Sequence, residues 1–166
     1  MPPKYIDTKG RTRFALKPKN EIDDIQKILF SVQYQAFAKS YLTVGLWSMP
    51  QPTGHGLEIT PLIDLSTVRV GDLVEFDVRC HGKPLSKGPN GVAYITAYSS
   101  SFGLSDKFAL FSYISKGKAQ FRVQSSGQWL VNVFHKAPMT KDGAMKEFGD
   151  KATSVGYGAT LTFNAK

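Results

Sequence analysis

With 42% hydrophobic and 12% aromatic residues, the 166-residue chain can bury a core and form one folded domain, which excludes wholesale disorder. A single cysteine, Cys80, excludes an internal disulfide framework, and no stretch approaches the roughly 20 apolar residues that a membrane-spanning helix needs. The net charge is +8, and in the first nineteen residues six Lys and Arg face only Asp7. Such a basic arm can attract phosphate groups, but it is more often a solvated linker, and we do not expect nucleic-acid binding.

The chain starts with Met1-Pro2-Pro3-Lys4 and has no apolar segment of the kind that a signal peptide needs. The sequence therefore predicts either a cytosolic protein or a mature or truncated chain that begins with an added methionine. Residues 1–27 are expected to form a basic arm or linker with one short strand at residues 11–16 and one short helix.

The expected helix begins after Asn20, a favoured N-cap residue, and acidic residues follow in its first turn. The positions that then recur at helical spacing are Ile22, Ile25, Ile28 and Leu29. From Phe30 the pattern changes to the alternation of a strand, although residues 37–42 fit the continuation of a helix equally well.

The remainder of the chain alternates as β-strands do. Val74, Phe76 and Val78 are separated by polar residues, so one face of this strand is buried and the other is wet. His81-Gly82 is placed where a tight hairpin turn is expected. The expected strands cover residues 57–60, 74–78, 92–98, 108–114, 119–123, 128–134 and 157–163. Short strands at this spacing predict an all-β sandwich or barrel over residues 28–166.

Seven segments, in this order, resemble motifs of one family of exported proteins of unknown function, often described as the periplasmic component of cobalt or nickel ABC-type uptake systems. The segments are residues 34–39 (YQAFAK), 54–62 (GHGLEITPL), 70–72 with 82–85 (VGD and GKPL), 117–121 with 127–131 (GKAQF and GQWLV), and 159–163 (ATLTF).

This resemblance implies an Ig-like or prealbumin-like β-sandwich, a periplasmic or cell-surface location, and a link to nickel or cobalt uptake. The partners would then be membrane components of a metal transporter. Longer members begin with a signal peptide and a first β-domain that carries a His-rich element, and this chain shows neither. Residues 1–27 would be a remnant of that preceding domain and its linker.

The candidate metal ligands are His55, Glu58 and His135, and the resemblance implies nickel or cobalt as the metal. His55 precedes Glu58 by three residues on a loop that enters a strand, so the two side chains could share a cation. The alternative, which we favour, is that His55 bonds the loop backbone and Glu58 pairs with a lysine such as Lys39. His135 ends a core-facing row and could reach a partner beyond the strand end, although a surface histidine is the commoner case.

Two further residues are candidates for ligand binding. They are Trp47, expected to be exposed in a loop rich in Pro and Gly, and His81, expected in a hairpin turn. Cys80 adjoins His81, and neighbouring side chains of a strand point to opposite faces, so these two do not readily chelate together. Trp129 is expected in the core rather than stacked on a sugar. A candidate aromatic stripe, which cross-strand packing explains adequately, consists of Tyr94, Tyr98 and Tyr113.

The sequence contains no nucleophile elbow, P-loop, dinucleotide fingerprint or HExxH helix, which favours binding over catalysis. The leading hypothesis is a non-catalytic periplasmic binding or accessory domain in nickel or cobalt uptake. The alternative is an Ig-like interaction domain that binds protein or carbohydrate at the cell surface through loops at one end of the sandwich. A third and weaker hypothesis is nucleic-acid binding through the basic arm.

Overall fold

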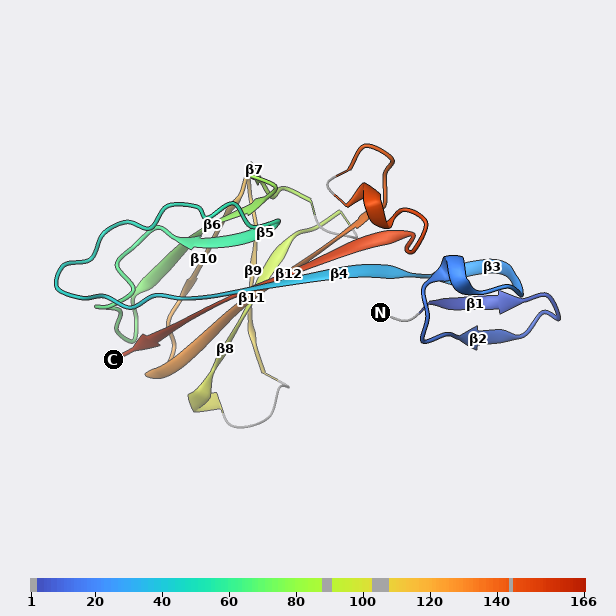
Figure 1. Ribbon diagram of the computed structural model, residues 1–166. Helices are drawn as coiled ribbons and strands as arrows, with labels where there is room; N and C mark the ends of the chain where they lie inside the picture. The colour runs from blue at the N-terminus through green and yellow to red at the C-terminus, as the bar shows by residue number, and fades with distance from the viewer. Residues whose placement is uncertain (1–2, 88–90, 103–107, 144) are drawn as a thin grey trace. The chain divides into compact units, whose positions relative to one another are not determined.

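The protein is all-β (Figure 1). The computed structural model describes residues 3–87, 91–102, 108–143 and 145–166. The chain divides into two compact units: unit 1 comprises Met1–Gln35 and Lys136–Gly156, and unit 2 comprises Ala36–His135 and Tyr157–Lys166. Within the described ranges the helical structure is limited to short 3₁₀ turns, none of them long and apolar enough to span a membrane.

Unit 1 contains a three-stranded antiparallel sheet in the order β2-β1-β3. Its strands are β1 (Lys4–Asp7), β2 (Thr12–Phe14) and β3 (Ile25–Phe30). The 3₁₀ turns η1 (Lys19–Glu21) and η3 (Lys146–Phe148) belong to the same unit. β2 confirms the short strand expected within residues 11–16.

The prediction of a helix after Asn20 is wrong. Only the turn η1 forms there, and β3 pairs with β1 instead. Ile28 lies opposite Tyr5 and Ile25 opposite Asp7, with a register shift between the two pairs. A bulge of this kind inserts an extra residue into one strand. Because of this bulge, Ile25 and Ile28 are both half-buried in the strand although they are three positions apart. A spacing of three is also typical of a helix, and this explains the wrong prediction.

Asp7 organises the turn between β1 and β2. Its buried carboxylate accepts the backbone N–H groups of Lys9 at 2.9 Å and Arg11 at 2.8 Å. It also pairs with the Nε atoms of Arg11 and Arg13, each at 3.2 Å. The hydrogen bond from the Arg11 backbone is the largest cause that lowers the pKa of Asp7 from 3.8 to about 2. Arg11 and Arg13, two of the cations of the basic arm, are thus already paired with Asp7.

Unit 2 is built from two sheets. In the first, β5 (Leu57–Pro61), β6 (Leu73–Cys80) and β10 (Lys118–Arg122) follow the order β10-β6-β5, and β7 (Lys83–Pro84) pairs with β6. The second has the order β4-β12-β11-β8-β9. Its strands are β4 (Val32–Ser40), β8 (Tyr94–Ser99), β9 (Leu110–Tyr113), β11 (Gly127–Pro138) and β12 (Ser154–Ala165). The turn η2 (Ser100–Phe102) follows β8, and β4, β11 and β12 each include residues of both units.

An aromatic core joins the two sheets of unit 2, which confirms the predicted sandwich. Trp129 of β11 stacks on Phe163 of β12, with ring centroids 6.3 Å apart. From the other sheet, Phe121 of β10 lies 5.3 Å from Trp129 and 5.9 Å from Phe76 of β6. Trp129 is fully buried, and its Nε1 donates to the Ser125 carbonyl at 3.0 Å, so its expected core role is confirmed.

The turn expected at His81-Gly82 is also confirmed. It joins β6 to β7, and both residues have positive φ, 47° at His81 and 75° at Gly82. Two consecutive positive φ values are typical of the type I′ turn, whose twist matches that of the flanking strands. Residues 37–42, which also fitted a helix, instead continue β4 as far as Ser40.

Candidate functional site

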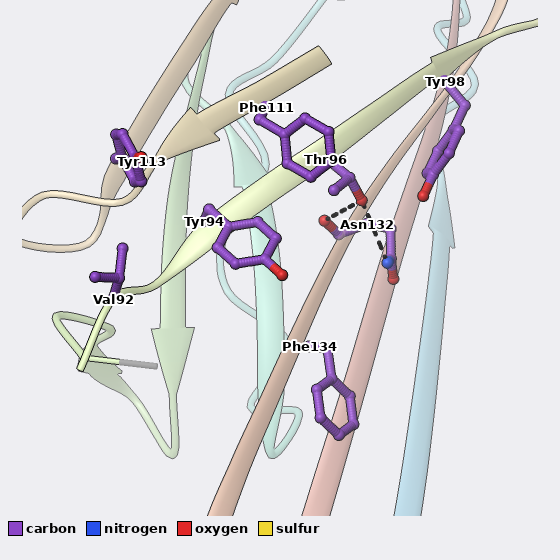
Figure 2. A pocket seen from close by; sticks show the side chains of 8 residues that line it. All are labelled: Val92, Tyr94, Thr96, Tyr98, Phe111, Tyr113, Asn132 and Phe134. Carbon is purple, nitrogen blue, oxygen red and sulfur yellow. Dashed lines mark hydrogen bonds between the residues drawn. The ribbon is translucent and has the colours of Figure 1, made fainter. Parts of the chain in front are cut away.

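The outer face of the second sheet of unit 2 carries a groove of about 1080 Å³ (Figure 2). Successive residues of a strand point to opposite faces. In β8, Ile95 and Ala97 are therefore fully buried in the core, whereas Tyr94 is 47% exposed. The groove is lined by Val92, Tyr94, Thr96, Tyr98, Phe111, Tyr113, Asn132 and Phe134.

The register of β8, β9 and β11 places these side chains next to one another. Tyr94 lies opposite Tyr113, and Thr96 lies between Phe111 on one side and Asn132 on the other. The rings of Tyr94 and Phe111 are 5.7 Å apart, and Phe111 and Tyr113 are 69% and 75% exposed. Large aromatic rings left in water on one continuous surface are typical of a binding site.

Two polar side chains lie between the rings. Thr96 Oγ1 donates to the backbone carbonyl of Asn132, and Asn132 Nδ2 donates to Thr96 Oγ1, each at 3.5 Å (Figure 2). Bonds of this length are weak, so the hydroxyl and the amide retain capacity to bind a ligand. None of the described residues that line the groove carries a charge.

The three tyrosines of the candidate aromatic stripe, Tyr94, Tyr98 and Tyr113, all line the groove. Sequence reasoning misses Phe111 and Asn132. The sequence shows that both residues lie in expected strands, where successive side chains alternate between the two faces. It does not show that β11, β8 and β9 are neighbours in the sheet, because the order of strands cannot be read from any one segment of the sequence.

Glu58, one of the predicted metal ligands, is held by donors from its own loop and from β4. Its carboxylate pairs with Lys39 Nζ and accepts the Thr53 N–H at 2.6 Å, the Thr53 hydroxyl at 2.9 Å and the Gly54 N–H at 3.3 Å. Burial opposes the ionisation of Glu58, but the bonds from Lys39 and Thr53 outweigh it and hold the pKa of this carboxyl below its usual range. The expected pairing of Glu58 with Lys39 is confirmed.

His55 stacks on Phe37 of β4, with ring centroids 4.8 Å apart and planes 15° from parallel. Its Nδ1 is buried and has no hydrogen-bond partner among the described residues. A cation shared by His55 and Glu58 stays a prediction, and both carboxylate oxygens of Glu58 already accept hydrogen bonds from the protein.

The other two histidines, His81 and His135, both lie in unit 2. Burial, and to a lesser extent the charge of His81, lower the pKa of His135. The Nε2 of His81 lies 2.9 Å from the hydroxyl of Tyr157, and the two rings meet edge to face at 5.0 Å. His135 Nδ1 is buried without a partner in the described part of the chain. No group of three or more His, Cys, Asp or Glu among the described residues is arranged to hold a metal ion.

Trp47 is half-buried rather than exposed, although its neighbour Leu46 is 93% exposed. Its ring lies 6.1 Å from that of Tyr41, and its Nε1 is buried without an acceptor among the described residues. Trp47 lines a second pocket of unit 2, separate from the aromatic groove, with a volume of about 320 Å³.

Comparison with known proteins gives a family but no close relative. A family described as Domain of unknown function (DUF4198) matches residues 3–137, which is most of the chain. No match was found among curated proteins or among solved structures. Nickel or cobalt transport is not part of the family's description. The chain belongs to the family described as Domain of unknown function (DUF4198).

Proposed function

We propose that this protein is a non-catalytic binding protein, and that the aromatic groove of unit 2 holds a neutral glycan. The observation that carries the proposal is the combination of exposed rings and an uncharged polar floor. Tyr94, Phe111 and Tyr113 are 47%, 69% and 75% exposed around the hydrogen-bonded pair of Thr96 and Asn132.

A pyranose ring has a face of C–H groups and a rim of hydroxyls, and the groove complements both. The C–H face packs on aromatic faces, which carry partial negative charge, and burial of both surfaces releases water. The hydroxyls need new partners once they leave water. Thr96, Asn132 and the hydroxyls of Tyr94 and Tyr113 supply both donors and acceptors. A charged ligand would find no opposite charge among the described lining residues.

The size and rigidity of the groove favour a chain of several sugar units. Its volume of about 1080 Å³ lies just above the usual range for pockets that hold small organic ligands. The lining side chains stand mainly on paired strands rather than on loops, so the protein loses little conformational freedom when a ligand binds. We further propose a periplasmic or cell-surface location, in keeping with the family resemblance, where glycans of the cell envelope are within reach.

Screening of the protein on an array of neutral oligosaccharides, followed by calorimetry, tests this function. Phe111→Ala and Tyr113→Ala should each weaken binding by about three- to tenfold, because each removes one stacking ring. Leu130→Ala is the matched control, since Leu130 is 38% exposed on β11 but does not line the groove. The absence of any glycan ligand, or an equal loss of affinity in Leu130→Ala, would contradict the proposal, and a protein ligand at the same surface would replace the glycan.

Nickel or cobalt binding in an uptake system is the second candidate, with membrane components of a transporter as partners. It is favoured by the proximity of His81 and His135 and by the partnerless Nδ1 of His135, because imidazole nitrogens are good ligands for these metals. Calorimetric titration with Ni²⁺ and Co²⁺ should show saturable binding that His135→Ala abolishes and His55→Ala preserves. If the intact protein takes up neither ion, this candidate is excluded.

A further inference from the structure

The loop that joins β4 to β5, residues 41–56, is long and uncharged (Figure 1). The structure describes all of its residues, and none of them belongs to a strand or a helix. From Ser40 to Gly56 the sequence contains no Asp, Glu, Lys or Arg, although 20% of the whole chain is charged. Loops longer than about 12–15 residues without secondary structure are uncommon and usually functional. This loop is therefore a candidate for a role beyond the connection of two strands.

Three apolar side chains of the loop are almost fully exposed. Leu42, Val44 and Leu46 are 90%, 85% and 93% exposed, and we call them the apolar tip. Their neighbours Thr43 and Trp47 are half-buried and line the pocket of about 320 Å³ in unit 2. Single exposed apolar residues are ordinary, but a group of them marks a site of contact with a protein or a membrane.

Aromatic rings lie at the base of the apolar tip. The rings of Tyr41 and Trp47 are 6.1 Å apart, and both residues are half-buried. Tyr and Trp, which combine an apolar ring with a polar O–H or N–H group, are enriched where a bilayer meets water. The order of apolar tip and aromatic base thus matches the order of hydrocarbon and interface in a bilayer.

Exposed cations lie at the same end of unit 2. Lys166 lines the pocket beside the base of the loop, and its backbone carbonyl accepts the Val70 N–H at 3.2 Å. Arg69 precedes Val70 in the chain, and the guanidinium of Arg122 donates to the carbonyl of Gly71. The three cations are exposed and so can reach the phosphates of lipid headgroups.

Two acids of the same segment oppose these cations. Asp64 accepts hydrogen bonds from Ser66, and Asp72 accepts the Arg69 backbone N–H at 2.9 Å. The local charge is thus nearly balanced, and the long-range attraction to an anionic surface comes from the net charge of +8 of the whole chain. Most of the affinity for a bilayer must then come from the apolar tip.

We propose that this loop docks unit 2 on the surface of a bilayer that contains anionic lipids, with the apolar tip inserted below the headgroups. The insertion is shallow, because the backbone of an irregular loop would lose its water partners in the hydrocarbon core. Leu and Val are under-represented among the residues that dominate protein interfaces, which favours a lipid over a protein partner. The inference does not rest on glycan binding, because the loop and the aromatic groove share no residue.

Co-sedimentation of the intact protein with lipid vesicles tests this inference. The probes are vesicles of phosphatidylethanolamine and phosphatidylglycerol in equal parts, and neutral vesicles of phosphatidylcholine alone. The protein should bind the anionic vesicles about tenfold more tightly than the neutral ones, and added salt should reduce this difference. Equal binding to both kinds of vesicle would overturn the choice of an anionic bilayer.

Variants assign the binding to the loop. Leu42→Ser and Leu46→Ser should each weaken binding to the anionic vesicles about five- to tenfold, because each removes one inserted side chain. Both side chains are exposed, so the midpoint of thermal unfolding should not change. Leu16→Ser is the matched control, since Leu16 is equally exposed but belongs to unit 1, and this variant should bind as the parent does.

Three further results would overturn the inference. The first is the absence of binding to the anionic vesicles. The second is binding by both loop variants as strong as that of the parent, or an equal loss in Leu16→Ser, since the basic arm or another surface would then hold the vesicle. The third is a dimer, seen by sedimentation velocity without lipid, that Leu46→Ser dissociates, because the loop would then contact a second copy of the chain.

Discussion

At the scale of single residues, buried and exposed ion pairs of this protein should differ in their contribution to stability. Glu58 and Lys39 have side chains that are 4% and 10% exposed. Without Lys39 the buried Glu58 carboxylate keeps the hydrogen bonds from Thr53 and Gly54 but has no opposite charge beside it, and loss of one partner of a buried ion pair costs about 3–5 kcal/mol. Lys39→Met should therefore lower the free energy of unfolding by about this amount in urea denaturation.

Lys118→Met is the matched control for this prediction. Lys118 pairs with Asp77 at 2.8 Å but is 57% exposed, and Asp77 keeps a second bond from Arg79. Exposed pairs contribute about 0–1 kcal/mol. Equal destabilisation by the two substitutions would show that the Glu58 carboxylate is not the buried charge described above.

Asp7 should control how unit 1 responds to acid. Its pKa is lowered from 3.8 to about 2, chiefly by the Arg11 backbone N–H. Because the folded value is the lower one, the stabilisation is complete above about pH 4 to 5 and is lost as the pH falls toward 2. NMR titration of the Asp7 carboxyl carbon should give a midpoint near 2, with faster exchange of the Lys9 and Arg11 amide protons below it. A midpoint near 4 would mean that the turn does not hold the carboxylate.

At the scale of elements, the turn into β10 depends on Gly117. Its φ is +80°, and an added Cβ would lie 2.7 Å from the Cβ of Pro84 in β7. Gly71 also has a positive φ, +95°, but open space around the Cβ position. Both alanine substitutions should suffer the backbone strain of about 1 kcal/mol, and only Gly117→Ala should add a steric clash. Thermal unfolding should show the lower midpoint for Gly117→Ala, and equal midpoints would contradict the described packing of β7.

The strands could be predicted from the sequence because one face of each is buried and the other is not. Val74, Phe76 and Val78 alternate with polar residues, and they are fully buried in β6. The same reasoning failed for β3, where a bulge between Ile25 and Ile28 breaks the period of two. Of the candidate site, the tyrosines of β8 and β9 could be found. The groove itself could not, because the pairing of β11 with β8 joins segments about thirty residues apart.

At the scale of the whole molecule, the chain belongs to a family of unknown function, so its role has to be inferred from its structure. The useful comparison is between the inner and the outer face of a sheet of the sandwich. In unit 2 the inner faces meet through Trp129, Phe121 and Phe163, and this packing accounts for the fold. The outer face of the five-stranded sheet carries the exposed aromatic rings that line the groove. Exposed rings on one continuous surface are typical of a binding site, and the proposal of glycan binding is based on them.

The most direct test of glycan binding is NMR mapping of the intact protein during titration with a neutral oligosaccharide found on the array. The account predicts shifts in the ring resonances of Tyr94, Phe111 and Tyr113 and in the side-chain amide of Asn132. The ring of Phe14, which is 70% exposed on β2 in unit 1, should not respond. Saturable binding that leaves the groove resonances unchanged, or shifts Phe14 equally, would contradict the assignment of the groove as the binding site.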